Sequence, residues 1–313
     1  MTVTLNPDVH EAGTARRAKR SGHERAQGRA AAILLAPWLI GVVGITAGPL
    51  LYSLVISFTK YSVITSPEWI GFDNYVEALG DDRLHKALQV TFIYALVGVP
   101  AQLVFALLLA VVLNRTLRGT QIYRSIYYLP SLLGGSVAIS LLWRQVFGGS
   151  GLVNTVLGHV GIEGPGWLTD PDLALFTLIL LHVWTFGSPM VIFAAALKQV
   201  PEHLYEAAKV DGCGPLRQFR SITLPLLTPI IFFNLVLQLI GAFQSFTQAR
   251  IMTDGNGGPA DSTLLITLYL YQQAFTSFRM GYASAIAWIL VLIVGAISAL
   301  LFITQRRWVF YDD

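Results

Sequence analysis

The segment 88–113 reads LQVTFIYALVGVPAQLVFALLLAVVL and contains no Asp, Glu, Lys or Arg. A helix that crosses a membrane needs roughly 20 mainly apolar residues, so this segment is long enough to span one. Across the whole chain 54% of the residues are hydrophobic and 12% are charged, whereas an ordinary soluble domain has about 25% charged residues. The composition therefore indicates a membrane protein.

Five other stretches of the chain are as long and as apolar, which predicts an all-α membrane protein with six transmembrane helices. The six expected spans are residues 30–58, 88–113, 125–147, 173–197, 226–252 and 282–304. Residues 29–308 would form this transmembrane domain. Residues 1–28 would be a basic, mobile N-terminal tail, and residues 309–313 a short C-terminal end.

Lys and Arg are distributed unequally between the two sides of these spans. The N-terminal tail, the second and fourth loops and the C-terminus together hold 15 of them, and the opposite loops and span ends hold 6. Because loops that remain in the cytoplasm carry the excess of positive charge, both termini are expected in the cytoplasm. The fourth loop, between the spans 173–197 and 226–252, is then cytoplasmic as well.

That fourth loop contains EAAKVDGCGPLRQFRSITLP at residues 206–225. Pro201 suits the first turn of a helix and Gly212 suits the residue just past its end, so a short helix is expected between them. Ala207 and Ala208 would let the backbone of another protein come close. The alternative is a helical hairpin that only joins two spans.

The spacing of Glu206-Ala207-Ala208, Gly212 and Leu224-Pro225 resembles the EAA loop of binding-protein-dependent ABC importer permeases. Three weaker signatures occur in the order that this family has: Gly71–Tyr75 (GFDNY), Tyr128–Pro130 (YLP) and Asn256–Pro259 (NGGP). The resemblance covers about residues 30–308 and is closest to the sugar and glycerol-phosphate branch. It implies a six-helix permease bundle that pairs with a second, homologous permease subunit.

The resemblance also implies a coupling loop, residues 201–225, that two ATP-binding cassette ATPase subunits grip. The residues it assigns to ATPase coupling are Glu206, Ala207, Ala208, Asp211 and Gly212. Glu206 would make a charged contact with an Arg or Lys of an ATPase, and the small residues would permit close approach.

Motifs for chemistry are absent from the sequence. It has no GxxxxGK[ST] phosphate-binding loop, no HExxH pair and no GxSxG nucleophile. Its single cysteine, Cys213, excludes an internal disulfide and a Cys-based zinc site. The chain is therefore expected to be a transport subunit and not an enzyme, with no cofactor or metal of its own, and with ATP and Mg on the partner ATPases.

Polar residues gather in the span 226–252. Gln238, Ser245 and Gln248, with Gln244 nearby, recur at helical spacing, so several are expected to share one face that points away from lipid. Amides offer a donor and an acceptor together, which suits a polyhydroxylated ligand. Helix–helix contacts or contacts with the partner permease are the alternative use of such residues.

The resemblance to carbohydrate permeases adds Ser150, Gly187 and Ser188 as candidate substrate contacts. His182 lies within the fourth span, where a neutral, hydrogen-bonded histidine is the ordinary interpretation. Arg144 and Arg250 lie near span ends and are explained as residues that extend to the membrane interface.

The sequence thus predicts a permease subunit in the bacterial plasma (inner) membrane that imports a sugar or related polyol by alternating access. Its expected partners are the second permease, the two ATPases, an extracytoplasmic solute-binding protein and membrane lipid, with no nucleic acid. Alternatives are an amino-acid-type or homodimeric importer permease, or a membrane-embedded enzyme. The identity of the solute does not follow from the sequence.

Overall fold

The computed structural model describes residues 33–114 and 120–310. The expected basic tail, Arg115, Arg118 and the last three residues lie outside this part of the chain. The chain divides into two compact units, which meet in the sequence between Ile56 and Ser57. Each unit is described by itself.

The first unit contains one apolar helix, Ile33–Ile56. It includes a π-helical turn, η1 (Val42–Ala47), followed by α2 (Gly48–Ile56). None of its described side chains is buried. An apolar helix without a covered face is suited to lipid on all sides, as expected for a membrane span.

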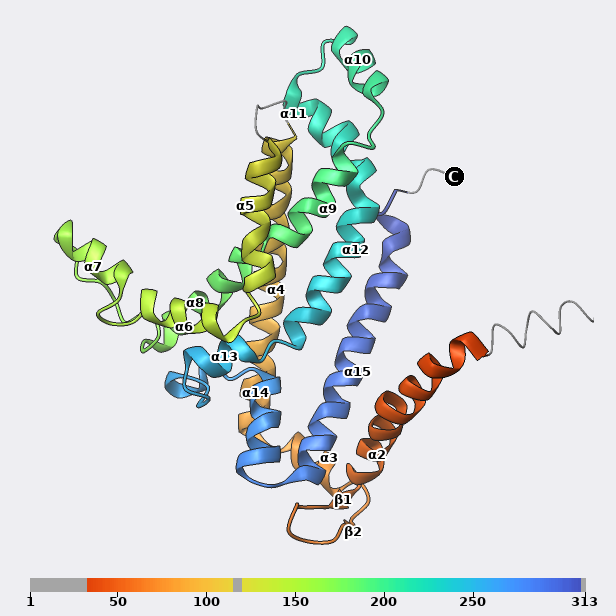
Figure 1. Ribbon diagram of the computed structural model, residues 1–313, viewed down its shortest axis with the longest axis vertical. Coiled ribbons are helices and arrows are strands. Elements are labelled where there is room, and N and C mark those ends of the chain that lie inside the picture. Colours follow the sequence, from red (N-terminus) through yellow and green to blue (C-terminus); the bar gives the residue numbers. More distant parts are fainter. Residues whose placement is uncertain (1–32, 115–119, 311–313) are drawn as a thin grey trace, which may run out of the picture. The chain divides into compact units, whose positions relative to one another are not determined.

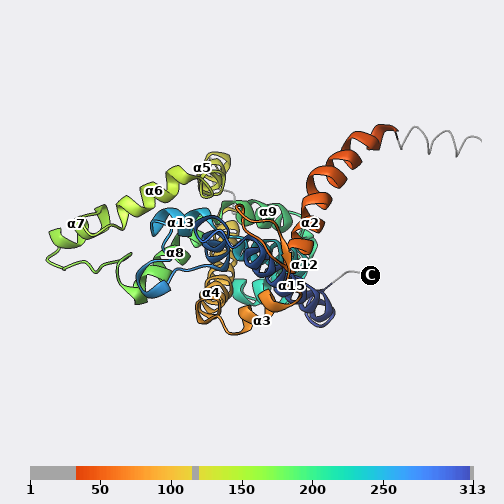
Figure 2. The same cartoon turned by 90° about the horizontal axis from the view of Figure 1, so that it is seen from below.

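The second unit is almost entirely helical (Figures 1 and 2). Its helices are α3 (Asp73–Leu79), α4 (Asp82–Leu113), α5 (Thr120–Leu133), α6 (Val137–Val146), α7 (Leu152–His159), α8 (Pro171–Trp184), α9 (Gly187–Leu197), α10 (Glu202–Val210), α11 (Pro215–Gln218), η2 (Phe219–Thr223), α12 (Leu224–Phe243), α13 (Thr247–Met252), η3 (Pro259–Asp261), α14 (Ile266–Tyr271), η4 (Gln272–Thr276), α15 (Met280–Thr304) and η5 (Gln305–Arg307). One short antiparallel hairpin joins β1 (Thr59–Lys60) to β2 (Glu68–Trp69), with Thr59 opposite Trp69.

The expected all-α fold is confirmed, but two of the six expected spans are bent and a third ends early. In the described residues four helices are long and apolar enough to cross a membrane, and six if each bent pair is one span. The pair Ile126–Leu133 and Val137–Val146 is bent by 105°, and the pair Pro171–Trp184 and Gly187–Leu197 by 42°. The expected span 226–252 ends as a helix at Phe243.

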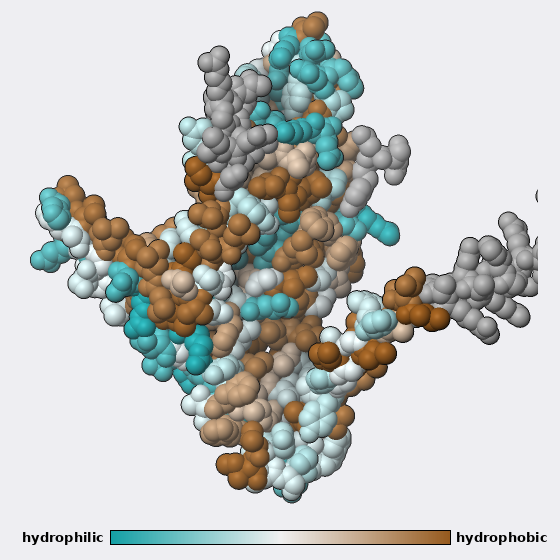
Figure 3. Space-filling view, in the orientation of Figure 1, coloured by the Kyte–Doolittle hydropathy of each residue, from teal (hydrophilic) through white to brown (hydrophobic). Residues whose placement is uncertain are grey.

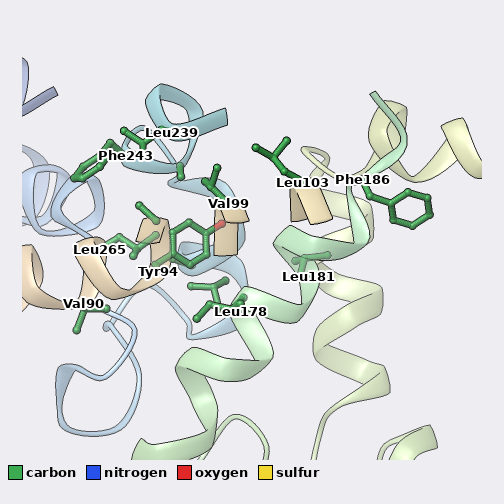
Figure 4. Close-up of a cluster of buried hydrophobic side chains, with 14 of the residues drawn as sticks. Val90, Tyr94, Val99, Leu103, Leu178, Leu181, Phe186, Leu239, Phe243 and Leu265 are labelled. Atoms are coloured by element: carbon green, nitrogen blue, oxygen red, sulfur yellow. The ribbon is translucent and has the colours of Figure 1, made fainter. Parts of the chain in front are cut away.

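Helix α4 is the centre of the second unit, where it packs against α8, α9 and α12. One face of α4 carries small or buried residues at spacings of three and four: Ala95, Gly98, Gln102, Ala106 and Ala110. Small side chains let helices approach closely in a membrane protein. Around this stripe lies the apolar core, in which Tyr94 is 1% exposed, among Val99, Leu178, Phe243 and Leu265 (Figure 4).

The GFDNY segment forms a small aromatic cluster beside the hairpin. Asn74 donates two hydrogen bonds, to the carbonyl oxygens of Ser57 at 2.8 Å and Thr59 at 3.0 Å. The ring of Phe58 packs against Phe72 and Tyr75, at centroid distances of 5.2 and 5.4 Å. This signature therefore fixes the chain as it enters the second unit.

Asp81 joins three helices at the same end of the unit. Its Oδ1 accepts hydrogen bonds from the backbone N–H groups of Arg83 and Leu84 and so caps α4. Its Oδ2 accepts from the hydroxyls of Tyr269 and Tyr282, each at 2.5 Å. Partial burial raises the pKa of Asp81, but the hydrogen bonds from the two tyrosines and the backbone outweigh it and hold the pKa below its ordinary value of 3.8.

We expect Asp81→Ala to lower the melting temperature of the purified protein, because it removes a helix cap worth about 1 kcal/mol and leaves two tyrosine hydroxyls without their acceptor. Asp82→Ala, in the exposed first turn of α4, is the control. Since the folded-state pKa of Asp81 is lowered, its stabilisation is present at neutral pH and is lost as the pH falls below about 4. The difference between wild type and Asp81→Ala should therefore shrink in acid. Equal melting temperatures for the two variants at pH 7 would contradict this role.

Candidate functional site

The segment 201–225 forms a helical hairpin at one end of the second unit, opposite α3 (Figure 1). Helix α10 ends in a left-handed glycine, Gly212, with φ of +71°. The N–H of Cys213 bonds to the carbonyl of Ala208 at 2.8 Å, and that of Gly212 to the carbonyl of Lys209 at 3.1 Å. These two bonds are the Schellman arrangement that closes a helix C-terminus, so the predicted helix and its stop at Gly212 are confirmed.

Most of the hairpin surface is open. Glu206, Ala207, Asp211 and Gly212 are exposed and Ala208 is half-buried. Hydrophilic residues gather over this end of the molecule (Figure 3), and two apolar side chains stand out among them: Val210 is 89% exposed and Leu216 is 65% exposed. Both side chains are therefore accessible to the surface of another molecule.

Two side-chain hydrogen bonds hold the two arms of the hairpin and its turn together. The hydroxyls of Tyr205 and Thr223 are 2.8 Å apart, and the amide of Gln218 donates to the carbonyl of Cys213 at 2.8 Å. Helical structure then runs without a break from Pro215 to Phe243 through α11, η2 and α12. The hairpin is therefore continuous with a long membrane-spanning helix.

Three of the expected spans are broken in the described part of the second unit. The first break lies at Gly134–Ser136, where Ser136 caps α6 by accepting from the N–H of Ile139 at 3.3 Å. The others lie between α8 and α9 and between α12 and α13. Beyond the first break α6 and α7 point away from α4 (Figures 1 and 2). Each break leaves backbone N–H and C=O groups without their helical hydrogen bonds. Inside a membrane these groups need other partners.

Gln102 supplies these partners at the α8–α9 break. Its Nε2 lies 3.2 Å from the carbonyl of His182, 3.1 Å from that of Thr185 and 2.9 Å from the Thr185 hydroxyl. Ser131 donates to the Thr185 carbonyl at 2.7 Å and accepts from the N–H of Ser188 at 2.7 Å. Helices α4, α5, α8 and α9 are thus joined through one polar cluster.

The α12–α13 break is joined to the first break. The amide of Gln248 donates to the carbonyl of Gly134 at 3.2 Å. Ser245 lies 3.3 Å from the hydroxyl of Tyr94, and its own hydroxyl donates to the Gln248 amide oxygen at 3.4 Å. We define the break cluster as Gln102, Ser131, Gly134, Thr185, Ser245 and Gln248.

The prediction that the polar residues of 226–252 share one helical face is wrong, because the helix ends at Phe243. Gln238 is half-buried on α12, whereas Gln244 is exposed at the helix end. Ser245 and Gln248 instead meet Tyr94 and Gly134 across the break.

The structure places the three candidate substrate contacts that the family resemblance added, Ser150, Gly187 and Ser188, in three different surroundings. Ser150 is exposed in the loop before α7. A Cβ at Gly187 would lie 2.5 Å from the carbonyl oxygen of Tyr127, so this glycine allows α9 to pack closely on α5. Ser188 takes part through its backbone N–H. Substrate contact by these residues, as by the glutamines, stays a prediction.

Several members of the break cluster were missed from the sequence. Gln102 is an amide in the middle of the apolar segment of α4 and is 1% exposed, and Gly134-Gly135-Ser136 is a breaker signal inside an expected span. The buried amide and the glycine pair can both be recognised in the sequence. His182 was expected to be hydrogen-bonded, but its ring packs against Tyr94 at 5.2 Å and its buried Nε2 has no hydrogen-bond partner among the described residues.

The charged residues near the span ends also differ from expectation. Arg144 forms a two-pronged ion pair with Asp254, with Nη2 at 2.6 Å from Oδ2. Asp254 lies in the loop that carries the NGGP signature, where Gly257 and Gly258 have positive φ. A group of three or more His, Cys, Asp or Glu side chains that could hold a metal is not found in residues 33–114 and 120–310.

Residues 80–308 match the family of binding-protein-dependent transport system inner membrane components. The probable ABC transporter permease protein YesP of Bacillus subtilis (strain 168) is 50% identical over 297 residues, which cover 94% of this chain and 96% of that protein. The lactose transport system permease protein LacF of Rhizobium radiobacter is 36% identical over 265 residues, which cover 83% and 88%.

A solved structure has the same fold. It belongs to a bacterial ABC transporter involved in the import of the acidic polysaccharide alginate, and it matches with a TM-score of 0.76 and 22% identity over 92% of this chain and 99% of that chain. The chain therefore belongs to the binding-protein-dependent importer permeases. It is a multi-pass inner membrane protein and a transport subunit.

We expect Gly134→Ala to destabilise the break cluster. The added Cβ would lie 2.1 Å from Thr185 Cγ2 and 2.8 Å from the carbonyl oxygen of Pro130, an overpacking that costs about 1–3 kcal/mol. A Cβ at the neighbouring Gly135 would meet no atom within 4 Å, so Gly135→Ala is the matched control. The melting temperature of the purified complex should fall for the first variant only, and an equal fall for both would contradict the packing at Gly134.

Proposed function

We propose that this chain carries a sugar or related polyol across the inner membrane by alternating access, as the permease subunit of an ATP-driven importer. The observation that carries the proposal is the exposed hairpin, continuous with α12, with the EAA residues at its surface. Membership of the importer permease family and the lactose permease LacF among the relatives support this class of function and solute.

ATP binding and hydrolysis would take place on two partner ATPases, which hold the ATP and Mg. In the proposed contact, Glu206 pairs with a basic ATPase residue, and Ala207, Ala208 and Gly212 allow the ATPase surface to come close. Asp211 would lie at the edge of the same contact. The exposed side chains of Val210 and Leu216 would supply the apolar part of the interface.

Movement of the hairpin would reach the membrane through η2 and α12. Because helical structure is continuous from Pro215 to Phe243, displacement of the hairpin would tilt α12 as a near-rigid rod. Its far end is the break beside Ser245 and Gln248. A small movement of α10 would therefore change the geometry of the break cluster, as alternating access requires.

The solute would pass beside the broken spans, where amides and hydroxyls are available in a membrane-spanning region. Gln238 on α12 and Gln244 just past its end are the side chains we assign to solute contact, with Gln248 held by Gly134 as a neighbouring polar group. A second, homologous permease would complete the pathway, and an extracytoplasmic binding protein would deliver the solute.

Glu206→Lys and Gly212→Val test the coupling contact in the assembled transporter. The first reverses the charge of the proposed ion pair. The second places a β-branched residue at φ of +71°, a strained conformation. We expect both to reduce ATP-dependent uptake at least tenfold while the chain still inserts in the membrane. Glu163→Lys, an exposed charge reversal in the loop between α7 and α8, is the control. Wild-type uptake by both hairpin variants would refute the coupling role.

Gln244→Leu tests the solute contact separately. Gln244 is exposed, so the substitution leaves the core unchanged and removes one amide from the pathway. We expect the KM for uptake to rise several-fold, corresponding to about 1 kcal/mol for one hydrogen bond, with little change in ATP hydrolysis. An unchanged KM in transport assays would exclude Gln244 from the solute pathway.

A further inference from the structure

A polar pocket lies beside α13, at the side of the break cluster away from the hairpin. Its volume is ≈ 400 Å³, within the range of small-molecule sites. Arg144 of α6 and Arg250 of α13 line it together with Asp254, Asn256, Tyr271 and Gln272. Helix α13 packs against α6, so the walls of the pocket belong to one packed body.

Arg250 is the unusual member of this pocket. Its guanidinium lies 4.2 Å from the ring centroid of Tyr271 and 5.8 Å from that of Phe246. Among the described residues no carboxylate lies within 4.0 Å of it, whereas Arg83, Arg144 and Arg279 each form an ion pair. An arginine that stacks on an aromatic ring keeps its N–H edges available for a planar acceptor.

The charge of the pocket follows from these pairings. Asp254 is the one carboxylate among the residues that line it, and both its oxygens are bound by Arg144. Arg250 therefore leaves the pocket with a single positive charge that no described side chain neutralises. A partly buried, unpaired guanidinium costs desolvation free energy that an anionic ligand recovers.

We propose that this pocket binds the carboxylate of an acidic sugar, such as a uronate unit of an oligosaccharide, with Arg250 as the charged ligand-binding residue. This inference rests on the proposed sugar transport and adds the substrate class. Tyr271 lines the pocket and is held between Phe246 and Phe275, with ring centroids 4.9–5.1 Å apart, so it offers a fixed aromatic surface beside a sugar ring. The Asn256 and Gln272 amides suit hydroxyl groups. One positive charge matches a carboxylate better than a doubly charged phosphate.

The test compares uptake of acidic and neutral oligosaccharides by the complete transporter with its binding protein. The probes are uronate-containing disaccharides, including digalacturonate, and their neutral counterparts, such as galactobiose. The variants are Arg250→Gln and Arg250→Lys, and the control is Lys86→Gln, which removes one charge from an exposed side chain of α4. ATP hydrolysis is measured in parallel to verify assembly.

Wild type should import at least one uronate probe. Arg250→Gln should reduce that uptake ten- to a hundredfold and change neutral uptake less than twofold, whereas Lys86→Gln changes neither. Arg250→Lys should restore only part of the acidic uptake, because an ammonium cannot make the paired hydrogen bonds of a guanidinium. Equal losses for acidic and neutral probes would overturn the inference and indicate a structural or partner-protein contact.

Import of neutral probes alone would also overturn the acidic substrate class and leave sugar transport in place. Import of neither class by an assembled transporter that hydrolyses ATP would instead overturn the proposed sugar function, and this inference with it.

Discussion

The hydrogen bonds around Thr185 are the interaction on which the rest of the structure depends. In a membrane every backbone amide needs a partner, which is why unbroken helices are the usual way to cross it. Within residues 33–114 and 120–310 three expected spans are interrupted, and at the α8–α9 break the carbonyl of Thr185 accepts hydrogen bonds from Gln102 of α4 and Ser131 of α5. The carbonyl of His182 accepts from Gln102 and from the N–H and hydroxyl of Thr185. Side chains of two neighbouring helices thus supply partners that the interrupted helix needs.

Helix α12 connects the hairpin at one of its ends to the break cluster at the other. The hairpin is mostly exposed, two hydrogen bonds hold it together, and continuous helical structure joins it to α12. At the other end of α12 the chain leaves the helix and meets α5 and α4 through Gln248, Ser245 and Tyr94. A displacement of α10 is therefore transmitted along continuous helical structure to the break between α12 and α13.

The sequence predicted the elements that depend on local composition. Apolar length predicted the spans, and Gly212 predicted the end of α10, because only a left-handed residue closes that helix. The bends could not be predicted from hydropathy. Gly134 and Gly135 are surrounded by apolar residues, so the stretch has the composition of an ordinary span. The partners that stabilise the bends are distant in sequence: Gln102 lies 83 residues from Thr185, and Arg144 lies 110 residues from Asp254. Such pairings depend on how distant segments pack together in the fold, which local sequence does not specify.

The central claim is that the hairpin transmits movement from an ATPase, and photo-crosslinking from position 210 tests it most directly. A photoreactive apolar residue in place of the exposed Val210, which leaves Glu206 intact, is activated in the intact transporter, in inverted membrane vesicles, with and without ATP. The account predicts an adduct with the ATPase subunit whose yield changes with ATP. An adduct with the solute-binding protein, or none with the ATPase in either state, would contradict it.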